Sequence, residues 1–136
     1  AATGMPLLHI ADATAAAVKS TGIERPLLLG TRYTMEQDFY RGRMQQRHGI
    51  EVMVPDEDER AEVNNVIYRE LCLGVIRASS RSRYLGIIEN ARKRGADGII
   101  LGCTEIGLLV TADDCDVPLL DSTRIHARNA LEFALQ

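Results

Sequence analysis

The chain has 136 residues, of which 46% are hydrophobic and 26% are charged, a composition typical of one globular domain with its own core. Its formal net charge is −3 and its basic residues form no block, which excludes the electrostatic footprint of a nucleic-acid-binding protein. No apolar run has the length of a membrane span, and three widely spaced cysteines fit neither a disulfide framework nor a metal site, which indicates a reduced, cytoplasmic protein.

Five short apolar segments are the predicted strands. In chain order they are PLLHI (6–10), RPLLLG (25–30), EVMVP (51–55), GIILG (98–102) and VPLLD (117–121). The unbroken apolar runs in RPLLLG and GIILG are typical of parallel strands that are covered on both faces.

Helical patterns lie between and after these strands. The predicted segments are 11–22, 31–49 (a loop and a helix), 56–76, 79–98 and 122–136. Gly22 and Gly95 stand where helices end, and acidic residues open the segment 56–76, where the helix dipole favours them. The strict alternation predicts an α/β domain in which a parallel sheet is flanked by helices on both faces. We expect residues 1–136 to form this single domain, with 122–136 as a closing helix.

An internal repeat suggests a duplicated architecture. The segments MPLLHIADATAAAVKS and VPLLDSTRIHARNALE share Pro-Leu-Leu, a turn and an alanine-containing helix, and they align on Pro6 and Pro118. In this alignment the residue that would correspond to Cys103 lies before Ala1. We therefore expect a sister motif in a preceding segment, which belongs either to a longer natural chain or to another polypeptide.

The segment GIILGCTEIGLLV places Cys103, Thr104 and Glu105 between a predicted strand and a predicted helix. In parallel α/β sheets, ligands bind beyond the carboxyl ends of the strands. A helix N-terminus is predicted to lower the pKa of the Cys103 thiol from about 8.5 towards about 7, where it serves as base or acid. The alternative is that Cys103 only packs in the core and that Glu105 only interacts with the helix dipole.

A second loop has the same position after another strand. LLLGTRYTM presents Gly30, Thr31, Tyr33 and Thr34, whose amides and hydroxyls suit an anion such as a carboxylate. The alternative is local, because Thr34 followed by Gln37 fits a capping box. The two interpretations are compatible.

The motifs GT-x-x-TM, P-x-x-DE and GCTE, with VPLLDSTRIHA near the end, resemble the second half of the aspartate/glutamate racemase family, in particular its broad-specificity amino-acid racemases. The resemblance covers nearly the whole chain. It implies two similar α/β domains that face each other across a cleft, with no cofactor and no metal. It also makes the closing helix 122–136 a candidate element of the first domain.

The resemblance also implies roles for individual residues. Two cysteines, one from each half, flank the α-carbon of the amino acid, and Cys103 matches the second of them. Thr31, Tyr33, Thr34 and Thr104 match substrate-binding positions. His126 lies in a D-x-x-x-x-H-A run, and it either tunes Cys103, contacts the substrate or is a structural helix residue.

Two other cysteines and one arginine have simpler interpretations. The apolar spacing around Cys72 predicts core packing, and Cys115 lies in a predicted loop without a role. By the resemblance, Arg77 lies roughly where some members of the family place a basic residue near the side-chain carboxylate of the substrate. The alternative, which the sequence favours, is that Arg77 lies on a solvated helix face. No residue of this chain matches the first cysteine of the family, so we expect the second thiol of the site to come from the preceding half.

The predicted function is cofactor-independent racemisation of aspartate, glutamate or a broader set of amino acids by two-cysteine acid/base chemistry. The expected partners are a small amino-acid substrate, the upstream half-domain or a second polypeptide, and a second copy in a homodimer. Two alternatives stay open. One is an inactive fragment that binds an amino acid through Thr31, Thr34 and Thr104, and the other is a hydrolase or transferase with Cys103 as nucleophile and His126 as base.

Overall fold

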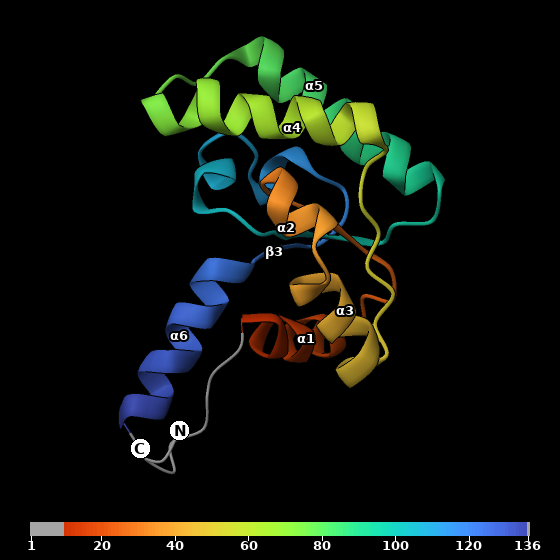
Figure 1. Cartoon of the computed structure of the whole chain (residues 1–136), viewed down its shortest axis with the longest axis vertical. Coiled ribbons are helices and arrows are strands. Elements are labelled where there is room, and N and C mark those ends of the chain that lie inside the picture. The colour runs from red at the N-terminus through yellow and green to blue at the C-terminus, as the bar shows by residue number, and fades with distance from the viewer. Residues whose placement is uncertain (1–9, 136) are drawn as a thin grey trace.

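The computed structural model describes residues 10–135 and shows a three-stranded parallel sheet between two layers of helices (Figure 1). The main elements are α1 (Ile10–Thr21), β1 (Pro26–Leu29), α2 (Arg32–Glu36), α3 (Asp38–His48), α4 (Glu57–Arg69), α5 (Ala78–Lys93), β2 (Gly98–Leu101), β3 (Leu119–Asp121) and α6 (Ser122–Leu135). Three 3-10 helices join them: η1 (Leu71–Leu73), η2 (Thr104–Leu108) and η3 (Ala112–Asp114). The strand order is β1-β2-β3, which confirms the predicted α/β fold class.

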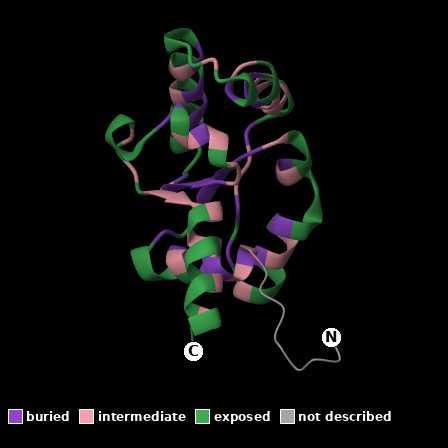
Figure 2. Ribbon diagram, turned by 90° about the vertical axis from the view of Figure 1, so that its left-hand side faces the viewer, coloured by how far each residue is buried: buried purple, intermediate pink, exposed green. Residues whose placement is uncertain are grey.

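The strand side chains divide the core into two parts, one on each face of the sheet. Leu27 and Leu29 of β1, with alternate residues of β2, pack against α4 and α5. Leu28 and Ile100 pack against α1 and α3 on the opposite face. Figure 2 shows the resulting band of buried residues along the strands and the inner sides of the helices. This alternation explains why each strand is apolar throughout.

The predicted strand 51–55 is wrong as a full strand. Met53 forms one isolated parallel bridge with Leu27, through hydrogen bonds from Leu28 N to Met53 O and from Met53 N to Pro26 O, both 2.8 Å. The pairing stops at once because Pro55 has no N–H to donate to a ladder. The predicted strand 6–10 lies outside the described residues except for Ile10, which begins α1.

Two predicted segments are divided differently in the structure. The segment 31–49 divides into α2 and α3, because Gln37 between them is extended, with φ −85° and ψ 149°. The segment 56–76 divides at Arg69, and η1 follows and ends at Gly74, whose φ of 78° is left-handed. Asp56 caps α4 in a capping box with Glu59, which agrees with the acidic start of this helix.

Cys72 corrects another expectation. Cys72 lies in η1 and is exposed, while its neighbour Leu71 is buried. The predicted core packing of Cys72 is therefore wrong, because the chain leaves the α-helical path at Arg69 and changes which residues face inward. Cys115 is half-buried and packs against the larger core cluster.

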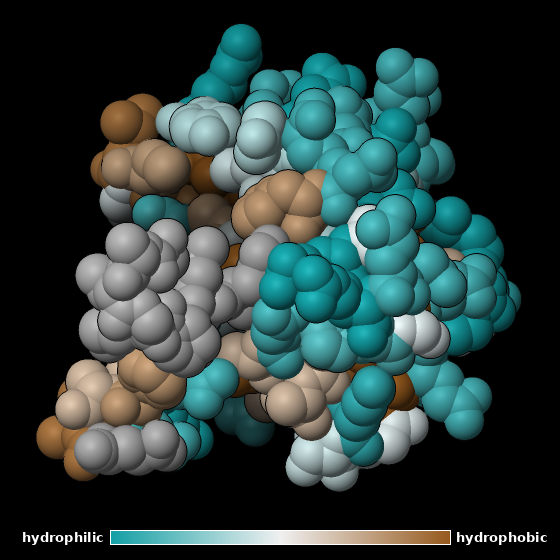
Figure 3. Space-filling model, turned by 60° about the horizontal axis from the view of Figure 1, so that its bottom comes forward, coloured by the Kyte–Doolittle hydropathy of each residue, from teal (hydrophilic) through white to brown (hydrophobic). Residues whose placement is uncertain are grey.

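Helix α6 follows β3 directly and packs against α1 at its start. Ser122 is buried there, and its Oγ lies 2.7 Å from Thr14 Oγ1 and within hydrogen-bonding distance of Tyr40 OH. The far end of the helix extends away from the sheet (Figure 1), and Leu131 and Leu135 are 60% and 78% exposed. In Figure 3 most of the face shown is hydrophilic, and apolar surface gathers towards its left. Within residues 10–135, no helix combines the length and apolar character of a membrane span.

Candidate active site

The two predicted site loops lie side by side at the carboxyl ends of β1 and β2. Gly102 N donates to Leu29 O at 2.7 Å, and a Cβ on Gly102 would lie 3.2 Å from Thr34 Cγ2. A Cβ on Gly30 would lie 3.3 Å from Thr34 Cβ. Both glycines therefore allow the threonine-bearing turn to pack against the residue that precedes Cys103.

Cys103 occupies the end of this junction as a half-buried, free thiol. Its Sγ donates a hydrogen bond to Glu105 Oε2 at 2.8 Å, and Thr104 Oγ1 donates to the same oxygen at 3.0 Å. The thiol therefore lies one residue from the close approach of Gly102 to Thr34. Thr104 is exposed.

The protonation state of Cys103 differs from the sequence-based expectation. Burial, and then the hydrogen bond to the Glu105 carboxylate, raise the pKa of the thiol to about 12. The backbone N–H groups of Glu105 and Ile106 act in the opposite direction with a smaller effect. The predicted lowering of the pKa is wrong because burial and the neighbouring carboxylate outweigh the N-terminus of η2, which is only five residues of 3-10 helix.

Glu105 is a site residue that sequence reasoning underestimated. The hydrogen bond from Cys103 is the main cause that lowers the pKa of its carboxyl group, ahead of those from its own N–H and from Thr104. The two pKa shifts agree, because the raised pKa of Cys103 and the lowered pKa of Glu105 both leave the shared proton on sulfur. A thiol and carboxylate two residues apart meet only in this tight turn, so a helical pattern did not reveal the contact.

The Thr31–Thr34 turn is also built by a local cap. Thr31 is the N-cap of α2, and its Oγ1 accepts from Thr34 N at 3.3 Å and lies 3.1 Å from Thr34 Oγ1. The cap is therefore Thr31, and the predicted capping box of Thr34 with Gln37 is wrong. Tyr33 points away from the core with 65% exposure, and its ring lies 6.4 Å from that of Phe39.

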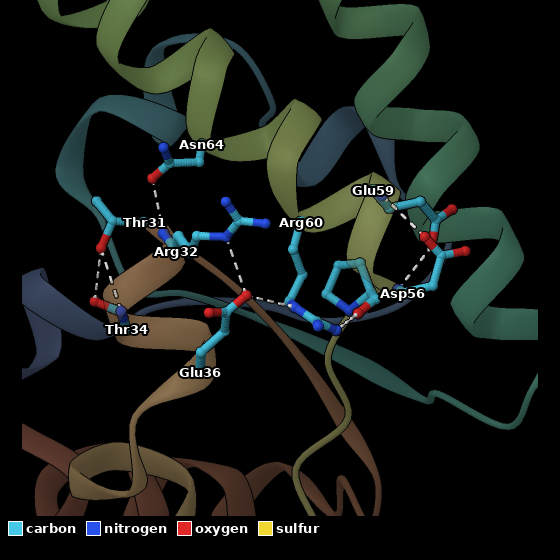
Figure 4. A network of polar contacts seen from close by, with 9 residues as sticks. Thr31, Arg32, Thr34, Glu36, Asp56, Glu59, Arg60 and Asn64 are labelled. Atoms are coloured by element: carbon cyan, nitrogen blue, oxygen red, sulfur yellow. Dashed lines mark hydrogen bonds and ion pairs between the residues drawn. The ribbon is translucent and has the colours of Figure 1, made fainter.

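A polar network fixes this turn to helix α4 (Figure 4). Arg32 N donates to Asn64 Oδ1 at 2.8 Å, and the Nε atoms of Arg32 and Arg60 each lie 3.1 Å from Glu36 Oε2. Arg60 Nη1 also donates to Pro55 O at 2.6 Å. The motifs GT-x-x-TM and P-x-x-DE are thus joined in space, a relation that their separate positions in the sequence did not predict.

His126 is not hydrogen-bonded to the thiol within the described residues. Its Nδ1 is buried without a hydrogen-bond partner among residues 10–135, and no hydrogen bond in this range joins it to Cys103. The structure therefore shows no cysteine–histidine pair of the kind that a cysteine nucleophile uses.

A cavity of about 540 Å³, which Thr104 helps to line, lies between η2, η3, β3 and α6. Its lining includes Asp121, Arg124 and Arg128. Across the described part of the chain, no group of three or more His, Cys, Asp and Glu side chains is placed to hold a metal ion.

Solved structures with the same fold come from three organisms. A protein proposed to be an Asp/Glu racemase from Yersinia pestis is 57% identical, with a TM-score of 0.94, over 99% of this chain and 59% of its own. An aspartate racemase homologue from Pyrococcus horikoshii OT3 is 36% identical, with a TM-score of 0.89, over 98% of this chain and 58% of its own. The Picrophilus torridus aspartate racemase, at 24% identity and a TM-score of 0.69 over 92% of this chain and 51% of its own, shares the fold.

This chain thus spans less than two thirds of the first two structures, consistent with one half of a larger architecture. The family model for Asp/Glu/Hydantoin racemase matches residues 1–130. Together with the GCTE and GT-x-x-TM loops side by side at the sheet edge, this match shows that the chain belongs to the Asp/Glu/Hydantoin racemase family.

Proposed function

We propose that this chain supplies one acid/base face of a cofactor-independent amino-acid racemase. The main supporting observation is Cys103, a half-buried thiol that is hydrogen-bonded to a carboxylate and directly follows Gly102, which packs against the Thr31–Thr34 turn. Racemase family membership supports the reaction class.

The reaction needs a second group on the opposite face of the substrate. Removal of an α-proton without a cofactor requires a base held on one side of the α-carbon and an acid on the other. Cys72 lies exposed in η1, and Cys115, like Cys103, packs at the edge of the larger core cluster. Within residues 10–135 no hydrogen bond joins either of these thiols to Cys103. The second thiol is proposed to come from the preceding half, in a longer chain or in another polypeptide.

The substrate is proposed to be aspartate, glutamate or a broader set of amino acids. Thr31, Thr34 and Thr104 bring hydroxyl groups to the same sheet edge as Cys103 and suit the carboxylate of a bound amino acid. The proposed roles of Tyr33 and His126 rest on the family resemblance, since neither is hydrogen-bonded to Cys103 within the described residues. The proposal also includes a homodimer in the cytoplasm.

The test is racemisation of L-aspartate and L-glutamate by the complete two-half protein, followed by chiral chromatography. Cys103→Ala is expected to lower kcat by at least about a thousandfold, because it removes one of two proton-transfer groups. Cys72→Ala, a matched loss of an exposed thiol, is expected to retain activity. Full activity in Cys103→Ala would refute the assigned role.

A further inference from the structure

The contact between Cys103 and Glu105 supports an inference about the resting site. Glu105 Oε2 accepts from both Cys103 Sγ and Thr104 Oγ1, at 2.8 and 3.0 Å. A carboxylate is an acceptor only, so the proton in the shorter contact belongs to sulfur. None of the ion pairs among the described residues includes Glu105, which leaves its negative charge facing the thiol.

Among the described residues, the groups around the thiol form no ion pair that offsets this charge. On α5, Tyr84 is buried and donates to Val63 O at 2.7 Å, so it presents no cation. Glu70, at the end of α4, accepts from Ser80 at 2.6 Å and lies 3.8 Å from Arg77 Nε.

Three arginines with described contacts in this region lie on two helices. Arg81 of α5 donates its Nε to Leu109 O at 2.8 Å, at the far end of η2. Arg124 and Arg128 of α6 line the cavity beyond Thr104. No hydrogen bond or ion pair within residues 10–135 joins any of these cations to Glu105 or Cys103.

We propose that Glu105 is a positioning residue that holds Cys103 as a neutral thiol in the resting site, so that Cys103 is the face that donates the first proton. This inference rests on the proposed function for the identity of the reaction. It adds the order of proton transfer: the group on the opposite face first removes the α-proton of the substrate, and Cys103 then donates a proton to the α-carbon.

The proton transfer balances without any further reactant. When Cys103 donates, its S–H bond breaks, a C–H bond forms at the α-carbon, and the S–H electron pair stays on sulfur as the thiolate. In the reverse direction the thiolate takes the α-proton, and the C–H electron pair stays on carbon. The thiolate formed beside Glu105 is a strong base, because the adjacent carboxylate favours its reprotonation.

The test is the pH dependence of iodoacetamide alkylation of Cys103 in the 136-residue chain, measured peptide by peptide with mass spectrometry. Only the thiolate reacts, so the midpoint of the profile reports ionisation of this sulfur. In the wild type the midpoint is expected above the value of about 8.5 for an unperturbed thiol. In Glu105→Gln the midpoint is expected to fall and the rate at pH 8 to rise about tenfold, the factor for a change of one pH unit.

Two controls separate ionisation from access and folding. Glu89→Gln makes the same change on the exposed face of α5 and is expected to leave the Cys103 profile unchanged. The exposed Cys72 in the same molecule reports reagent reactivity, and circular dichroism reports folding. If Glu105→Gln does not fold, Glu105→Ala takes its place with the same expectation.

Two results would overturn the inference. One is a wild-type midpoint at or below that of an unperturbed thiol. The other is a variant rate that rises equally at every pH with an unchanged midpoint, because this would show that Glu105 only shields the sulfur. The measurement needs no racemase activity, so its failure is distinct from failure of the proposed function.

Discussion

Cys103, Thr104 and Glu105 are consecutive residues, yet they meet at a single carboxylate oxygen. The sequence predicted the positions of Cys103 and of the Thr31–Thr34 turn, because both follow apolar strands directly. It did not predict the Glu105 contact, which depends on the backbone of the η2 turn, or the anchoring by Asn64, which comes from a different helix. Local patterns predict where a site lies more readily than which side chains meet there.

At the residue scale, Gly102→Ala is expected to displace the threonine-bearing turn. The new Cβ would lie 3.2 Å from Thr34 Cγ2 and 3.4 Å from Leu29 O, so it has no free space. We expect a loss of about 1–3 kcal/mol in the free energy of unfolding, measured by urea denaturation. The control is Gly86→Ala in α5, where nothing lies within 4 Å, and there we expect a gain of about 0.5–1 kcal/mol. Equal effects at the two glycines would contradict the close approach.

Ser122→Ala tests the buried hydroxyl cluster that joins α6 to α1 and α3. The change removes the partner of Tyr40 OH and one partner of Thr14 Oγ1 in a buried site. We expect a cost of about 1–3 kcal/mol in the same denaturation assay, because a buried hydroxyl loses its hydrogen bond. Ser79→Ala, at an exposed position of α5, is the matched control and should change stability little. An equal loss of unfolding free energy in both variants would contradict a stabilising role of the buried hydroxyl cluster.

At the scale of the elements, alternating strands and helices predicted the layered fold, but the sequence predicted the lengths of the individual elements less accurately. Residues 51–55 have a strand composition but form only the bridge at Met53. The segment 31–49, expected to be a loop and one helix, contains two helices, α2 and α3, on either side of Gln37, and the helix expected over 56–76 ends at Arg69. Such boundaries depend on hydrogen-bond partners elsewhere in the fold, which an apolar period does not specify.

An ion cluster joins helices α1 and α3 and makes their packing sensitive to acid. Arg43 donates to both carboxylate oxygens of Asp12, at 3.0 and 2.8 Å, and His48 Nε2 lies 2.8 Å from Oδ1. The hydrogen bond from Arg43 lowers the pKa of Asp12 well below its ordinary value. A lowered pKa in the folded state gives a stabilisation that is present above about pH 4 and is lost as the pH falls.

Asp12→Asn is therefore expected to lower the Tm by a few degrees at pH 7 and to differ less from the wild type as the pH falls below about 4. Differential scanning calorimetry across this range measures the effect. Asp113→Asn, at an exposed position of η3, serves as the control and should follow the wild type. A Tm difference that is independent of pH would show that the charge of Asp12 does not stabilise the helix pair.

At the scale of the whole molecule, the chain spans 59% and 58% of two related structures and presents one thiol at its site. We expect the 136-residue chain alone to bind aspartate or glutamate without exchanging the α-proton, since the opposing group is proposed to come from the preceding half. Isothermal titration calorimetry and proton NMR in D₂O measure these two properties. Rapid exchange of the α-proton by this chain alone would contradict the proposal that the second proton-transfer group comes from the preceding half.

Cys103 is proposed to be one of two groups that act on opposite faces of the α-carbon. Its most direct test is racemisation of L-aspartate or L-glutamate in D₂O by the complete two-half protein, with the label followed in each enantiomer at low conversion. We expect deuterium at the α-carbon of the product enantiomer, none in the remaining substrate, and no labelling with Cys103→Ala. Equal labelling of both enantiomers, or labelling that survives the loss of Cys103, would contradict the account.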